Sequence, residues 1–123
     1  MHTRASVGDG TNVIAAADAD PNTTAPAANR IFTLPTLFPG GGFPSAWLIA
    51  EGGTPTIELW YLVSFPETPS VPSRWFRWNN AAVSVPVDQM TPFTTPSIPI
   101  DLPAFLRVTT VNGAKRVSIG VTA

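Results

Sequence analysis

The chain has 123 residues, a formal net charge of −1, and 12% charged against 44% hydrophobic residues. This length corresponds to one domain, and the hydrophobic share is large enough for a buried core. The balanced charge gives no electrostatic reason to expect a nucleic acid or an anionic membrane as partner. No cysteine is present and the single histidine is His2, so we expect no metal, no cofactor and no catalytic triad.

Residues 1–29 form the first predicted unit, an extended N-terminal arm. They contain no Phe, Trp or Tyr and consist mostly of Ala, Thr, Asp, Asn and Gly. Small side chains bury little area each, so this stretch cannot build a core of its own. Such a stretch is either a disordered tail or an arm ordered by a partner, and we favour the second, with Val13 and Ile14 as candidate contacts. Deletion of the arm should then leave the rest of the chain folded and abolish assembly.

Residues 30–123 form the second predicted unit, an all-β domain. Short runs of Val, Ile, Phe, Trp and Thr are interrupted by Pro and Gly, which is typical of strands joined by turns. The pattern predicts an antiparallel β-sandwich or a small barrel. The expected strands lie near residues 30–38, 45–51, 56–65, 73–79, 82–87, 102–111 and 114–122.

Two of these strands carry further information. The run 56–65 is apolar on both sides, because Trp60 and Leu62 alternate with the other apolar residues, so it is central or covered by another chain. Asn112-Gly113 lies between the last two runs and predicts a type I′ hairpin, with Val108 facing Val117. Few charged residues protect the sheet edges, which also favours a partner.

The densest group of candidate contact residues is the run Arg74–Trp78. In a strand, Trp75 and Arg77 share one face, while Arg74, Phe76 and Trp78 share the other. Trp and Arg are enriched at the centres of protein interfaces, so we expect a partner-contact surface here. The residues assigned to it are Arg74, Trp75, Arg77 and, from the neighbouring strand, Trp60. The alternative is a carbohydrate-binding, lectin-like sandwich with Trp75 or Trp60 as the stacking plane.

Two acidic patterns are weaker candidates for chemistry. Asp18, Asp20 and Asn22 match the opening of a calcium loop, but the glycine and glutamate that such a loop needs further on are missing. Glu51 and Glu58 flank a predicted turn and could face each other as a glycosidase pair does. Neither pattern is complete, and we expect the protein not to be an enzyme.

The chain also resembles a known type of protein. An Ala/Thr-rich arm, a cysteine-free sandwich rich in Pro and Thr, and the closing run Leu102–Gly113 resemble small virion proteins of tailed bacteriophages, the head decoration or cement type. The resemblance implies a structural protein assembled into the virion in the host cytoplasm. It implies other virion proteins as partners, the major capsid protein first, and a homo-oligomer, with a trimer favoured. A tail or baseplate component is the nearest alternative.

Overall fold

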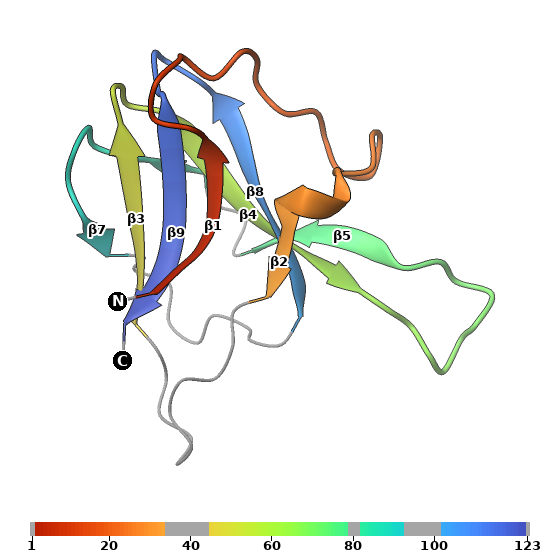
Figure 1. Ribbon diagram of the computed structural model, residues 1–123. Helices are drawn as coiled ribbons and strands as arrows, with labels where there is room; N and C mark the ends of the chain where they lie inside the picture. Colours follow the sequence, from red (N-terminus) through yellow and green to blue (C-terminus); the bar gives the residue numbers. More distant parts are fainter. Residues whose placement is uncertain (1, 34–44, 79–81, 93–101, 123) are drawn as a thin grey trace.

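The computed structural model describes residues 2–33, 45–78, 82–92 and 102–122, which form two antiparallel sheets packed face to face (Figure 1). The first sheet has the order β1-β9-β3-β7, and the second has the order β2-β8-β4-β5, with β6 also paired to β4. The strands of the first sheet are β1 (His2–Gly8), β9 (Arg116–Thr122), β3 (Ser45–Glu51) and β7 (Thr91–Pro92). The strands of the second are β2 (Ile31–Thr33), β8 (Pro103–Thr110), β4 (Thr56–Val63), β5 (Arg74–Arg77) and β6 (Val83–Ser84). The predicted β-sandwich is confirmed, and its sheets stay separate instead of closing into a small barrel.

The core lies between the two sheets and follows the alternation of the strands. Its fully buried members are Leu48, Ala50, Val117 and Ile119 from the first sheet, with Ile57, Leu59, Tyr61, Leu106 and Val108 from the second. Burying each large aliphatic side chain contributes about 1.5–3 kcal/mol. The 3₁₀ turn η1 (Ala28–Arg30) directly precedes β2, and within the described residues no helix is long and apolar enough to cross a membrane.

Strand β3 has the predicted bounds, and β4, β8 and β9 begin or end within two residues of them. Strands β2, β5 and β6 are shorter than expected, although parts of the first two predictions, residues 34–38 and 79, lie outside the described residues. The pattern gave no signal for β7, which contains only two residues.

The turn at Asn112-Gly113 is confirmed, but the hairpin pairing is wrong. Both residues have positive φ, 46° and 80°, and the Ala114 N–H donates to the Val111 carbonyl at 3.0 Å. However, β8 pairs with β2 and β4, whereas β9 pairs with β1 and β3. The turn therefore links the two sheets. The strands β8 and β9 do not pair with each other, because each is an interior strand that already has two neighbours. Val108 and Val117 belong to the same core cluster, but they lie on different sheets instead of on neighbouring strands of one ladder.

The beginning of the chain also differs from the predicted arm. Residues 2–8 form β1, an edge strand paired along its length with β9, and Val7 is part of the core. The sequence gives little sign of this strand, because β1 contributes a hydrogen-bonded ladder and only modest apolar area.

Residues 9–30, the crossing segment, then run from the first sheet over the second (Figure 1). The Gly10 and Ile14 N–H groups donate to the carbonyls of Lys115 and Ala114, next to the turn between the sheets. Ile14 packs partly against the core, whereas Val13 is 54% exposed. The segment that was expected to need a partner is thus held by the sandwich of its own chain.

Candidate functional site

Asp18 binds the crossing segment to the part of the β8 edge that β2 does not pair with. Its backbone N–H donates to the Val108 carbonyl, and its carboxylate accepts the Val108 N–H, both at 2.8 Å. The same carboxylate forms an ion pair with Arg30 at 2.7 Å. Arg30 also donates to the Leu106 carbonyl at 2.9 Å. This part of the segment therefore satisfies backbone groups of β8 that would otherwise lack a neighbouring strand.

Asn22 satisfies backbone groups at the opposite edge of the second sheet, on β5. Its side-chain carbonyl accepts the Trp75 N–H, and its amide donates to the Trp75 carbonyl, each at 2.9 Å. A side-chain amide carries the same donor and acceptor as a peptide group, so Asn22 occupies the place of a neighbouring strand. The edge of β5 is therefore closed at this point by the chain itself.

The three residues of the calcium pattern, Asp18, Asp20 and Asn22, are engaged in hydrogen bonds within the protein. The oxygens of Asp18 and Asn22 accept protein hydrogen bonds, and an Asp20 oxygen accepts the Asn22 N–H at 2.8 Å. Among the described residues, no group of three or more possible metal ligands is found.

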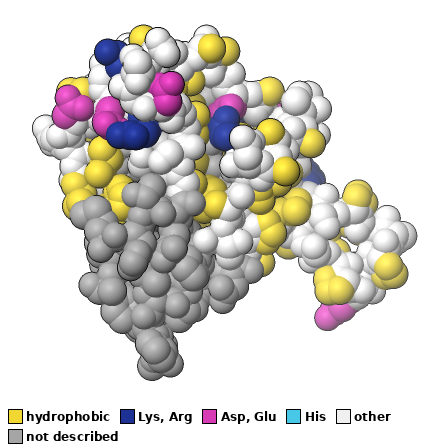
Figure 2. Space-filling view, viewed as in Figure 1, with side chains coloured by type: hydrophobic (Ala, Val, Ile, Leu, Met, Phe, Trp, Pro, Cys, Tyr) yellow, Lys and Arg dark blue, Asp and Glu magenta, His cyan; other side chains and the backbone are white. Residues whose placement is uncertain are grey.

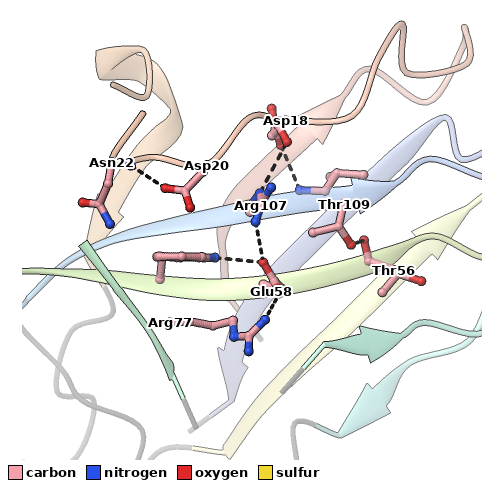
Figure 3. A network of polar contacts seen from close by, with 10 residues as sticks. Asp18, Asp20, Asn22, Thr56, Glu58, Arg77, Arg107 and Thr109 are labelled. Carbon is pink, nitrogen blue, oxygen red and sulfur yellow. Dashed lines mark hydrogen bonds and ion pairs between the residues drawn. The ribbon is translucent and has the colours of Figure 1, made fainter. Parts of the chain in front are cut away.

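Beneath the crossing segment lies a buried acidic group, Glu58, which is 4% exposed (Figure 3). One carboxylate oxygen accepts Trp60 Nε1 at 3.1 Å and Arg107 at 2.9 Å, and the other accepts Arg77. Arg107 also donates to the Asp18 carbonyl at 3.3 Å. One carboxylate thus holds together β4, β5 and β8, and through Arg107 it reaches the crossing segment.

Burial opposes the ionisation of Glu58, but the hydrogen bonds from Arg77 and Trp60 and the charge of Arg77 outweigh it. The pKa of Glu58 therefore lies below its ordinary value. An ionised carboxylate with three donors is a structural group, because all of its charge is committed to protein contacts.

Trp60, Trp75 and Phe105 form a second small core on this outer face, with Leu62 packed against it. Trp75 is 7% exposed, and its ring meets that of Phe105 edge to face at 6.1 Å. The expectation that Trp60 and Trp75 form an exposed patch is therefore corrected. Buried rings offer neither a partner contact nor a stacking plane for a sugar. Arg77, the third residue of that face, is committed to Glu58.

The second acidic pattern is separated by the fold. Glu51 ends β3 in the first sheet and pairs with Arg116, whereas Glu58 lies in the second sheet. The hydrogen bond from Arg116 lowers the pKa of Glu51. Two carboxylates with separate arginine partners on different sheets do not form an acid–base pair.

The most exposed apolar group of the second sheet lies on β4 and β5, which extend beyond the sandwich as a projecting hairpin, residues 62–77 (Figure 1). Its tip consists of two successive β-turns. Thr68 N–H donates to the Phe65 carbonyl at 3.0 Å, and Val71 N–H donates to the Thr68 carbonyl at 2.8 Å. Pro66 and Pro69 occupy the second position of these turns, where their fixed φ is favourable. The hydroxyls of Ser64 and Ser73 join the base of the loop at 3.0 Å.

The side chains on this hairpin remain exposed because of where it lies. Phe76 pairs with Tyr61 on the core-facing side of the second sheet, yet Phe76 is 42% exposed and Tyr61 only 3%. At β5 that side already extends past the cover of the first sheet. Phe65 meets Phe76 edge to face at 6.3 Å, and the Arg74 guanidinium lies 5.4 Å from the Phe76 ring centre.

The hairpin therefore presents an exposed set of side chains on a framework of strands and proline turns. In Figure 2 it is the lobe at the lower right, with hydrophobic side chains at its surface. Val71 at the tip is 44% exposed. Of the predicted contact residues, Arg74 belongs to this surface. Phe76 and Val71 were missed, although the regular spacing of Pro66 and Pro69 was a signal for a rigid tip.

No family model, no curated protein and no solved structure matches the chain in the three comparisons.

Proposed function

We propose that this chain is a non-enzymatic structural subunit that joins a larger protein assembly through the projecting hairpin. The observation that carries the proposal is the exposed Phe76 with Arg74 stacked on it, presented on the core-facing side of a strand beyond the end of the first sheet. Aromatic and arginine side chains supply most of the binding energy at protein interfaces.

The rigidity of the hairpin supports the same proposal. Its two proline turns, its serine pair and its aromatic contact fix the tip before any partner arrives. A preorganised surface loses less conformational entropy on binding than a mobile loop of the same composition. The identity of the assembly is proposed from the resemblance of residues 30–123, which favours a phage particle and a decoration role on its head.

The experiment that tests this proposal follows the chain into particles. Particles are purified on a density gradient from cells that produce the assembly, with either the parent chain or a Phe76→Ser variant. We expect the parent chain to sediment with the particles and the variant to remain with free protein.

Ile31→Ser is the matched control, because Ile31 is exposed to a similar degree, 36% against 42% for Phe76, but lies on β2. This variant should sediment with the particles. If the parent chain never sediments with particles, the assignment to a particle is wrong. If Phe76→Ser sediments like the parent, the hairpin is not the contact.

A further inference from the structure

A second surface, on the outer face of the first sheet, is complementary to the projecting hairpin. It is a cleft of about 520 Å³ that lies over β1, β3 and β9 and is bordered by the turn before β7. Its volume falls in the range of roughly 300–1,000 Å³ in which proteins hold small groups. The lining residues that matter are Ile49, Asp88 and Met90.

The cleft and the hairpin match in apolar character. Met90 is 49% exposed, and Ile49 lines the same cleft. A flexible thioether makes favourable contacts with the edge of an aromatic ring. Phe76, with Val71 at the tip, is a side-chain set of suitable size and chemistry for this cleft.

The two surfaces also match in charge. Within the described part of the chain, Asp88 in the cleft and Arg74 on the hairpin form no ion pair, whereas Glu51 and Arg116 in the cleft neutralise each other. The cleft therefore carries one uncompensated carboxylate beside the apolar side chains of Ile49 and Met90, in a lining that is otherwise mostly polar. The hairpin carries one uncompensated guanidinium beside an aromatic ring.

We propose that the partner of the projecting hairpin is a second copy of this chain, whose cleft receives Phe76 while Asp88 receives Arg74. This inference rests on the proposed function and names its partner. Figure 1 places β7 and the tip of the hairpin at opposite ends of the molecule. One copy can therefore insert its hairpin into a second copy while its own cleft receives the hairpin of a third. Such a head-to-tail contact closes into a ring or extends into an open chain. A trimer, which the resemblance to decoration proteins implies, would be a closed ring of three copies.

The test is the solution mass by light scattering over a hundredfold concentration range. The parent chain should form oligomers, and Phe76→Ser should weaken their association at least about thirtyfold, as removal of an interface anchor does. Met90→Lys in the cleft should weaken it similarly, because it removes the apolar contact and adds a charge that repels Arg74. Ile31→Ser, on β2 and outside both surfaces, should associate like the parent.

Mixing the two variants gives the sharpest result. Each variant keeps one intact surface, so Phe76→Ser and Met90→Lys together should form a one-to-one dimer that does not grow further. Exchange of the charges as Arg74→Asp with Asp88→Arg should restore association that either change alone removes.

Two results overturn the inference. One is a parent chain that stays monomeric over the whole range, and the other is a mixture of the two variants that stays monomeric while the parent associates. The particle experiment separates this failure from that of the proposed function. Loss of Phe76→Ser from particles, together with a monomeric parent, would leave the proposed function standing with a different protein as the partner.

Discussion

The crossing segment is more firmly bound, and the projecting hairpin more exposed, than their amino-acid compositions suggest. Residues 9–30 have no Phe, Trp or Tyr, yet they are bound to both sheets through Asp18, Asn22 and backbone groups. The hairpin carries aromatic residues and nevertheless exposes one of them, Phe76. Order in a segment depends on where its polar groups find partners, and apolar content alone does not predict burial.

Removal of either region provides the largest test of this comparison. Deletion of residues 1–29 should abolish cooperative unfolding, because it removes β1 and Val7 and uncovers the edges that Asp18 and Asn22 satisfy. This reverses the expectation from the sequence, which treated these residues as dispensable for folding. Replacement of residues 64–73 by an Asn-Gly turn should leave a cooperative transition. Thermal unfolding followed by circular dichroism decides it, and a cooperative melt of the deleted chain would contradict the structure.

The next largest effect on stability is expected at Glu58, which lies beneath the crossing segment and connects β4, β5 and β8. Glu58→Gln should lower the free energy of unfolding by about 3 kcal/mol at neutral pH, because it leaves Arg77 and Arg107 without their shared counter-charge. Denaturant unfolding measures this. Glu67→Gln, at the exposed hairpin tip, is the matched control and should change the free energy by less than about 0.5 kcal/mol.

The pH dependence of that difference follows from the lowered pKa of Glu58. A carboxyl group with a lower pKa in the folded state stabilises the fold above its ordinary value of 4.5, and this stabilisation is lost as the pH falls through the folded pKa. The gap between parent and Glu58→Gln should therefore narrow between about pH 5 and pH 3. A gap that stays constant over this interval would show that the pKa of Glu58 is not lowered in the folded state, and a gap that widens would show that it is raised.

A smaller effect is expected at the amide that closes β5. Asn22→Ala should cost about 1 kcal/mol and should increase hydrogen exchange at the Trp75 N–H, which loses its acceptor. Asn22→Asp keeps that acceptor but loses the donor to the Trp75 carbonyl, so it should protect the Trp75 N–H better than alanine does. Equal exchange in all three chains would show that the edge is closed by other groups.

The smallest effect on stability belongs to the most exposed ring. Phe76→Ser should change the free energy of unfolding by about 1 kcal/mol or less, because the ring is 42% exposed and contributes one edge contact and one cation–π contact. Its effect on association should be far larger. A loss of several kcal/mol in a urea titration would mean that Phe76 belongs to the core.

Some elements of the fold could be predicted from local sequence, whereas the pairing of distant strands could not. The strand at 45–51 and the positive φ at Asn112-Gly113 follow from local pattern and turn chemistry. The pairing of β8 with β9 failed because a turn specifies only its own backbone, and each strand then paired with partners from distant parts of the chain. The double-sided apolar character of β4 predicted a strand that is central or covered by another chain, and β4 is central, between β8 and β5, with the Trp60 cluster on its outer face.

The sequence by itself determined the all-β class, most of the strands, the turn at Asn112-Gly113 and the lack of any cysteine chemistry, because these depend on residue type and short spacings. Only the tertiary structure decided which aromatic side chains are buried and which polar side chains close the sheet edges. Trp75 is buried and Phe76 exposed although they are neighbours in one strand, since the Trp75 ring packs against Trp60 and Phe105 on the outer face of the second sheet, whereas the other side of β5 extends beyond the first sheet. Such differences depend on contacts between residues that are distant in the sequence, as Asn22 and Trp75 are, and no local pattern encodes them.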